Sequence, residues 1–123
     1  METQTTKPKV LVVDDERVIA DTLAIILNKA GFDASAVYTG TGAVERARSD
    51  RPDLIISDVI MPDMNGIEAA INIRAFLPGC KILLFSGQAA TADLLESARA
   101  KGHDFEILAK PVHPGDLLAK LRQ

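Results

Sequence analysis

Val10-Leu11-Val12-Val13-Asp14-Asp15 is the stretch that decides the fold: four apolar residues, three of them β-branched, are followed at once by two acids. A short apolar run of this kind predicts a strand buried on both faces, as strands are in parallel sheets. The same form recurs three times, at Leu54 to Ile56 before Ser57-Asp58, at Ile82 to Phe85 before Ser86-Gly87, and at Phe105 to Ala109 before Lys110-Pro111. The sequence therefore predicts several buried strands, each followed by polar residues.

Segments with helical periodicity lie between these runs. The clearest is Glu16 to Ala30, whose apolar residues fall on one face at intervals of three and four. A weaker run, Ala34 to Tyr38, predicts a strand nearer the sheet edge. Shorter helical segments are Thr41–Ser49, Gly66–Phe76, Thr91–Ala100 and Pro114–Leu121. A strand followed by a helix, five times over, is typical of a doubly wound α/β fold, written (βα)5.

The length and composition fit one domain. The chain has 123 residues and 47% hydrophobic residues, which can fill a core without disulfides or a structural metal. We expect a single domain over residues 8–123, a disordered tail over residues 1–7, and no output domain in this chain.

Charge and hydropathy exclude several classes of protein. A net charge of −3 and a pI near 5.3 argue against a protein that neutralises nucleic-acid phosphates or anionic lipid. No apolar stretch reaches the roughly 20 residues of a spanning helix, and the single Cys80 cannot form an internal disulfide. We therefore expect a cytoplasmic protein with no direct nucleic-acid or membrane contact.

The residues that follow the predicted strands include three acids and one lysine. Ligands of open parallel sheets bind beyond the carboxyl ends of the strands, so these residues should meet at one edge. They are Asp14, Asp15, Asp58, Ser86 and Lys110. Carboxylates that converge repel one another unless a cation joins them, and Mg²⁺ prefers such oxygen ligands.

The three acids and the lysine can also have purely structural roles, without binding a ligand. Asp14-Asp15 can cap the helix that follows, Asp58 can belong to a turn, and the Lys110 side chain can run from a strand end into solvent. Asp63, in the loop after Asp58, is interpreted as a turn residue and not as a fourth ligand.

The motifs together closely resemble the receiver domain of two-component response regulators, the CheY-like and flavodoxin-like fold. They are Asp14-Asp15, the segment Asp58-Val59-Ile60-Met61-Pro62-Asp63-Met64-Asn65-Gly66, Ser86-Gly87, and Lys110-Pro111. The resemblance runs from about Lys9 to Gln123. It implies a five-stranded parallel sheet of order 2-1-3-4-5 and a role in bacterial phosphorelay signalling.

The resemblance also implies a role for each site residue. Asp58 would accept a phosphoryl group from a sensor histidine kinase or a histidine phosphotransfer protein. Asp15, Asp58 and the Ile60 backbone carbonyl would bind Mg²⁺ directly, with Asp14 acting through a water. Ser86 and Lys110 would contact the phosphoryl group. The signal would pass to a downstream protein through the surface of residues 91–100, 105–109 and 114–121, with no enzymatic activity beyond the domain's own phosphorylation and dephosphorylation.

Ile107 and Ile60 are among the positions that depart from the family's pattern. Ile107 stands where an aromatic or polar switch residue is usual, which puts the usual rotamer switch in doubt. Ile60 is apolar, so its side chain cannot position an attacking water. The Lys110–Pro111 peptide bond is expected to be cis, as in the family.

Three other functions remain open. A Mg²⁺-dependent hydrolase that forms an aspartyl-phosphate intermediate would carry an Asp-x-Asp motif. Here Val59-Ile60 follows Asp58, so the second acid of that motif is replaced by Ile60. A flavodoxin-like cofactor binder would need a phosphate-cradling loop where Asp14-Asp15 stand. The chain can also be the receiver fragment of a larger regulator.

Overall fold

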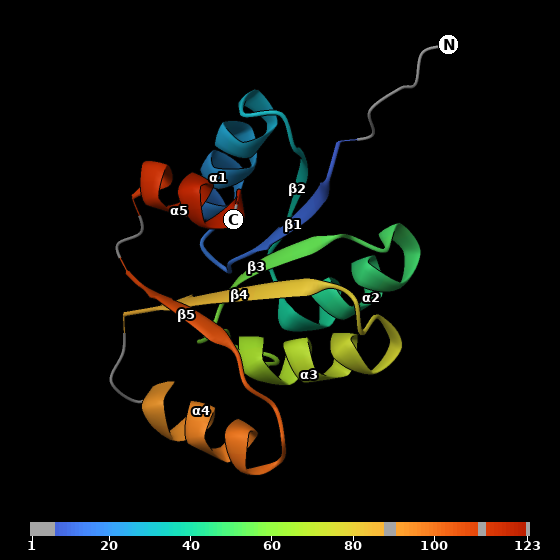
Figure 1. Cartoon of the computed structure of the whole chain (residues 1–123), viewed down its shortest axis with the longest axis vertical. Coiled ribbons are helices and arrows are strands. Elements are labelled where there is room, and N and C mark those ends of the chain that lie inside the picture. The colour runs from blue at the N-terminus through green and yellow to red at the C-terminus, as the bar shows by residue number, and fades with distance from the viewer. Residues whose placement is uncertain (1–6, 88–90, 111–112, 123) are drawn as a thin grey trace.

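The computed structural model describes residues 7–87, 91–110 and 113–122. Strands and helices alternate along the described chain without interruption (Figure 1). The elements are β1 (Lys9–Val13), α1 (Arg17–Lys29), β2 (Asp33–Val37), α2 (Gly40–Asp50), β3 (Leu54–Asp58), α3 (Gly66–Phe76), β4 (Lys81–Ser86), α4 (Thr91–Ala100), β5 (Glu106–Ala109) and α5 (Pro114–Leu121). All ten correspond to predicted segments, with boundaries that differ by at most two residues.

The strands form one parallel sheet of order β2-β1-β3-β4-β5. This confirms the doubly wound fold with strand order 2-1-3-4-5, and β2 lies at an edge as predicted. The register pairs Val13 with Ser57 and Ser86 with Ala109. The residues after β1, β3, β4 and β5 therefore reach the same edge of the sheet.

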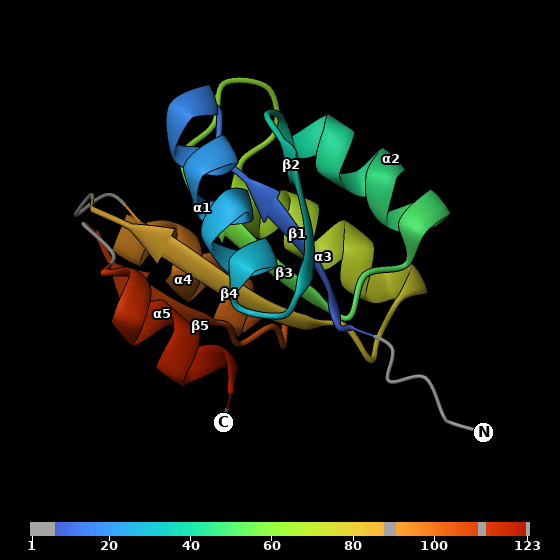
Figure 2. The ribbon, with the colours of Figure 1, turned by 90° about the horizontal axis from the view of Figure 1, so that it is seen from above.

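Helices cover both faces of the sheet (Figures 1 and 2). Helices α1 and α5 lie on one face, and α2, α3 and α4 lie on the other. Alternation along β1 divides its side chains between two cores: Val10 and Val12 pack under α1 and α5, whereas Leu11 and Val13 pack under α2 and α3. Burial on both faces explains why the inner strands are continuous apolar runs.

Strand β5 differs from the prediction. It was expected to be buried on both faces, but Glu106 and Ala109 are exposed, and Ile107 and Leu108 are only partly buried. The physical reason is its place at the sheet edge, where β4 is its one neighbour among the described strands. The carboxylate of Glu106 forms an ion pair with Lys120 of α5, at 2.7 Å.

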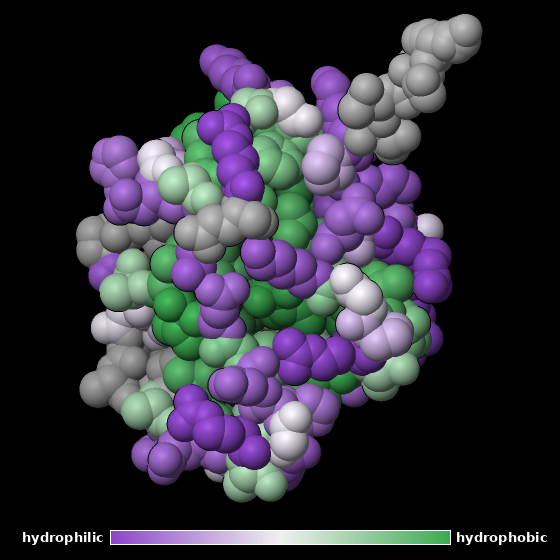
Figure 3. Space-filling model, viewed as in Figure 1, coloured by the Kyte–Doolittle hydropathy of each residue, from purple (hydrophilic) through white to green (hydrophobic). Residues whose placement is uncertain are grey.

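On the face seen in Figure 3, hydrophilic side chains surround apolar ones that are visible toward the middle of the view. Within the described residues, none of the helices has the length and apolar character needed to span a bilayer. Residues 1–6 of the predicted tail lie outside the described part of the chain.

Candidate functional site

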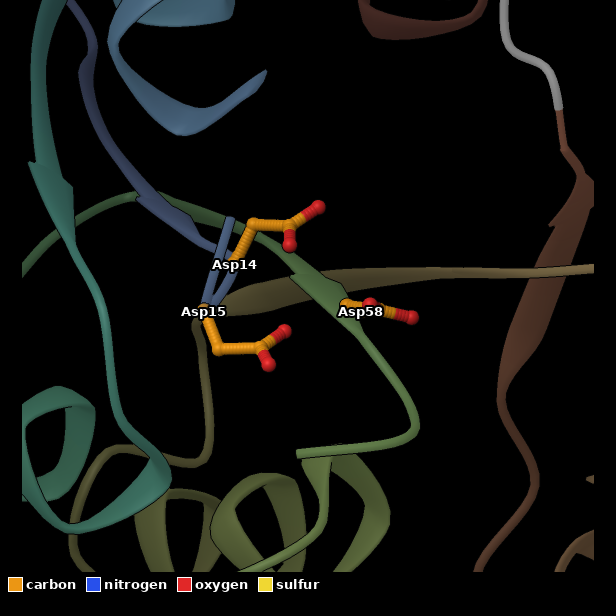
Figure 4. Close-up of side chains that lie close together, drawn as sticks. All are labelled: Asp14, Asp15 and Asp58. Atoms are coloured by element: carbon orange, nitrogen blue, oxygen red, sulfur yellow. The ribbon is translucent and has the colours of Figure 1, made fainter. Parts of the chain in front are cut away.

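Three carboxylates meet at the carboxyl edge of the sheet. Asp14 and Asp15 follow β1 directly, and Asp58 is the last residue of β3. Their side chains extend toward the same space (Figure 4), and one carboxylate oxygen from each lies within 4.8 Å of the others. The predicted convergence of these acids is confirmed.

Asp14 is the most buried of the three acids. Its side chain is fully shielded from solvent. Oδ1 accepts a hydrogen bond from the Glu16 backbone N–H at 3.0 Å, whereas the buried Oδ2 has no hydrogen-bond partner among the described residues. Burial raises the pKa of the Asp14 carboxyl, and the charges of Asp58 and Asp15 raise it further. The hydrogen bond from Glu16 and the charge of Lys110 lower this pKa, but the net shift is upward.

Lys110 brings a positive charge to these carboxylates. Its Nζ donates a hydrogen bond to Asp58 Oδ2 at 3.0 Å and lies 3.6 Å from Asp14 Oδ2. Burial of the ammonium lowers the Lys110 pKa, but the hydrogen bond to Asp58 and the charges of Asp58 and Asp14 outweigh that effect and raise it. Lys110 is therefore protonated and placed between two acids.

Ser86 and Gly87 complete the edge. Ser86 ends β4, is buried, and its carbonyl accepts the Lys110 backbone N–H at 3.1 Å. A Cβ atom on Gly87 would come within 3.3 Å of the Lys110 Cβ. Glycine at this position leaves the Lys110 side chain room to reach the carboxylates.

The donor set fits a hard divalent cation. Among the described residues, three carboxylates share one ammonium, so the cluster keeps excess negative charge, and none of these residues donates a hydrogen bond to the buried Asp14 Oδ2. Clustered carboxylate oxygens are the ligands that Mg²⁺ binds in proteins. The cluster is therefore compatible with a magnesium site.

The structural interpretations of these residues do not account for their positions. The N-cap of α1 is Glu16 and carries no side-chain cap bond, so Asp14 and Asp15 do not cap that helix in the usual way. Asp58 lies in a strand and not in a turn. The Lys110 ammonium contacts two acids instead of extending into solvent.

Asp63 lies in a bend of the loop after Asp58, as predicted, but it also makes contacts that the sequence did not indicate. Its carboxylate accepts hydrogen bonds from the backbone N–H groups of Gly40 and Thr41, at the start of α2. A helix N-terminus favours a carboxylate because its first N–H groups lack partners within the helix. No sequence signal links two segments that are 22 residues apart, so only the fold reveals this contact.

Gly66 is a second residue whose role sequence analysis missed. It begins α3, and its N–H donates to the Val59 carbonyl at 2.7 Å. Any Cβ atom at this position would overlap the Asp58 carbonyl oxygen. Glycine is needed here because the helix starts directly against the end of β3.

Two positions that depart from the expected pattern are partly exposed. The Ile60 side chain, two residues after Asp58, is 39% exposed. Ile107 is partly buried against the core under α2, α3 and α4. The predicted cis peptide bond involves Pro111, which lies outside the described residues.

Removal of the Asp14 charge is expected to stabilise the metal-free protein. In a chelating buffer, Asp14→Asn should raise the free energy of unfolding by about 1 kcal/mol. The amide keeps an acceptor for the Glu16 N–H but removes a buried charge that faces Asp58. Urea unfolding followed by circular dichroism, with EDTA and with Mg²⁺, measures the effect.

Asp15→Asn is the matched control because Asp15 is exposed, so its charge is already solvated. We expect its stability to change by less than about 0.5 kcal/mol. Added Mg²⁺ should reduce the advantage of Asp14→Asn, since ligand binding stabilises the native wild type. A less stable Asp14→Asn protein in EDTA would show that Asp14 is not under electrostatic strain.

Comparison with known proteins gives relatives of two kinds. CheY, the chemotaxis protein of Thermotoga maritima, is 34% identical over 116 residues, which cover 94% of this chain and 95% of CheY. The DNA-binding response regulator MtrA of Mycobacterium tuberculosis is 34% identical over 118 residues, which cover 96% of this chain and 50% of MtrA. The chain thus spans about half the length of the first curated relatives it matches.

Solved structures show the same fold. A CheY-like receiver domain protein from Methanospirillum hungatei JF-1 has a TM-score of 0.85 at 28% identity, covering 96% of this chain and 92% of that one. The chemotaxis protein CheY4 of Vibrio cholerae has a TM-score of 0.84 at 31% identity, covering 95% and 98%. The family model of the response regulator receiver domain matches residues 10–122. This chain therefore belongs to the response regulator receiver domain family of two-component systems.

Proposed function

We propose that this receiver domain accepts a phosphoryl group on Asp58 and acts as a signalling switch. The observation that carries the proposal is the meeting of three carboxylates with the Lys110 ammonium, which lies 3.0 Å from Asp58 Oδ2. Asp58 is 7% exposed, at the edge where the strands of the sheet end. An incoming phosphoryl group would reach the carboxylate through this small exposed part, at the sheet edge.

The metal ligands would be the carboxylates of Asp14, Asp15 and Asp58 and the backbone carbonyl of Ile60. Asp14 would act through a water and the others directly. Bound Mg²⁺ would neutralise charge on the phosphoryl oxygens. With it, the formal charges of three carboxylates, one divalent cation and Lys110 cancel, which lowers the repulsion that a phosphoryl donor meets.

The reaction is a transfer between two side chains. A carboxylate oxygen of Asp58 forms a bond to phosphorus, and the bond from phosphorus to the donor's histidine nitrogen breaks. The electron pair of that bond stays on the imidazole. The Asp58 carboxylate thereby becomes an acyl phosphate, and its single charge is replaced by roughly two on the phosphoryl group.

The added charge provides a route to signalling. Lys110 already contacts Asp58, and Ser86 lies on the adjacent strand. Both would move toward the phosphoryl oxygens, and the movement would reach the surface formed by α4, β5 and α5, where a downstream protein binds. Ile107 cannot exchange a buried ring for an exposed one, so the change would involve backbone movement after Ser86.

An apolar groove beside Lys110 supports a protein as phosphodonor. The groove has a volume of about 510 Å³ and is lined mainly by α1, including Val18 and Ile19, with Lys110 and Pro114 at its other side. Val18 is 78% exposed, so it adds accessible apolar surface to this groove. A helix of a histidine kinase or histidine phosphotransfer protein would cover it and present its histidine to Asp58.

Ile60, two positions after Asp58, favours a signalling switch over a hydrolase. In an aspartyl-phosphate hydrolase a second acid would stand there to protonate the leaving group, but Ile60 has no titratable side chain. We therefore propose a cytoplasmic, non-enzymatic domain that contacts proteins and not nucleic acid. Since MtrA is a DNA-binding regulator of about twice this length, the receiver part of a larger regulator is the second candidate.

Incubation with acetyl phosphate tests the phosphoryl transfer without a partner. We expect intact-mass spectrometry to show one added phosphoryl group with Mg²⁺ and none with EDTA. Hydroxylamine should remove the label, as it does from acyl phosphates. A label that resists hydroxylamine, or that forms equally in EDTA, would contradict the proposal.

A further inference from the structure

The side chain of Asp63 joins the loop after the phosphorylation site to a distant helix. This loop, residues 59–65, runs from Asp58 to the start of α3. Asp63 Oδ1 accepts the Gly40 N–H at 3.2 Å, and Oδ2 accepts the Thr41 N–H at 3.1 Å. The two oxygens of one carboxylate therefore bind the first two amides of α2.

The contact suits a carboxylate at this helix end. The first turn of α2 contains no acidic residue of its own, so Asp63 supplies the negative charge that the helix dipole favours. Hydrogen bonds with Thr41 are the main cause that lowers the Asp63 pKa below its ordinary value. The bonds thus favour the ionised carboxylate over a protonated one.

Backbone packing supports the same link. Gly40 lies so close to the Met64 carbonyl oxygen that a Cβ atom would overlap it. The third amide of α2, from Gly42, is bound by Thr39 Oγ1 at 2.9 Å, within the helix's own N-cap. Asp63 and Thr39 therefore both cap α2, but only Asp63 also holds the loop.

Hydrogen bonds also hold the loop at each of its two ends. The Val59 N–H donates to the Phe85 carbonyl of β4 at 3.3 Å, and its carbonyl accepts the Gly66 N–H. At the α3 end, the Asn65 side chain accepts the Glu68 N–H at 2.8 Å in a capping box. Ile60 and its neighbours span the part between these anchors, and the Asp63 carboxylate ties that part to the start of α2 by hydrogen bonds.

We propose that Asp63 is a positioning residue of the phosphorylation site. By tying the loop to α2, it holds the Ile60 backbone where its carbonyl can bind the metal together with Asp58. The inference rests on the proposed function, because that function assigns the Ile60 carbonyl to Mg²⁺. It adds a coupling between metal binding and the start of α2.

The coupling must act in both directions. If the Asp63 bonds favour metal binding, then metal binding favours those bonds to the same extent. The amides of Gly40 and Thr41 should exchange their hydrogens more slowly when Mg²⁺ is bound. This effect is separate from phosphorylation and can be measured in the unphosphorylated protein.

Two variants of Asp63 and one control test the inference. Asp63→Ala removes both acceptors, and Asp63→Asn keeps the shape and one acceptor oxygen. Thr39→Val is the matched control, since it removes a cap bond from the same helix and leaves the Asp63 carboxylate and its two amide partners in place. Mg²⁺ titration followed by NMR gives the half-saturating concentration, and amide exchange with and without Mg²⁺ gives the coupling.

We expect the half-saturating Mg²⁺ concentration to rise about three- to tenfold in Asp63→Ala, by analogy with residues that support metal ligands. Asp63→Asn should lie between Asp63→Ala and wild type, and Thr39→Val should match wild type. Slower exchange of Gly40 and Thr41 on Mg²⁺ binding should persist in Thr39→Val and disappear in Asp63→Ala.

The possible failures can be distinguished. If the wild type binds no Mg²⁺, the proposed function itself fails and this inference fails with it. If the wild type binds Mg²⁺ but Asp63→Ala and Asp63→Asn behave as Thr39→Val does, Asp63 is only a helix cap and the inference is overturned. The Asn variant decides the question if Asp63→Ala does not fold.

Discussion

Asp58→Asn is expected to abolish phosphoryl labelling by acetyl phosphate in the presence of Mg²⁺. The amide that replaces the carboxylate is a far weaker nucleophile, and it removes one of the charges that would bind the metal. The side chain keeps nearly the same shape at a site that is 7% exposed, so the fold should be unchanged. Intact-mass spectrometry of the treated variant measures the loss directly.

Asp50→Asn provides the control for this result. Asp50 ends α2 and pairs with Arg46 at 3.0 Å, on an exposed part of the helix. Its variant should be labelled as the wild type is. If the Asp58→Asn protein carried a full label, the acceptor would be another residue and the assignment of Asp58 would be wrong.

Gly66→Ala is expected to cause the largest loss of stability. Its Cβ atom would overlap the Asp58 carbonyl oxygen and lie 3.1 Å from Ser57 Oγ, so β3 and α3 would have to move apart. Overpacking of this kind should lower the free energy of unfolding by about 3 kcal/mol. Urea unfolding gives the change, and acetyl phosphate labelling of the folded fraction should fall because Asp58 is displaced.

Gly79→Ala is the matched control, because a Cβ atom at Gly79 would meet no atom within 4 Å. Its stability should stay within about 0.5 kcal/mol of wild type. Equal urea midpoints for the two variants would mean that the close packing of α3 against Asp58 is easily relieved.

Much of the fold could be predicted because its determinants are local. The apolar run of β1 and the acids that follow it are contiguous in sequence, and parallel strands place their carboxyl ends at one edge. The convergence of Asp14, Asp15 and Asp58 follows from these two facts. The approach of Lys110 follows as well, because it stands directly after the last strand.

The remainder depends on contacts that local patterns do not encode. The apolar run of β5 suggested full burial, but a strand's exposure depends on its neighbours, and β5 has only one. Asp63 is of a residue type common in turns, and its hydrogen bonds to the start of α2 join segments that are far apart in the sequence. The need for glycine at position 66 also arises from packing between two elements.

The edge position of β5 means that the cation and the anions of the site stand on strands that are held to different degrees. Asp58 belongs to β3, and Asp14 follows β1, and each of these strands is hydrogen-bonded to neighbours on both sides. Lys110 follows a strand that is held on one side only, so displacing it breaks fewer backbone bonds. Moving Lys110 therefore costs fewer strand-to-strand hydrogen bonds than moving Asp14 or Asp58 would.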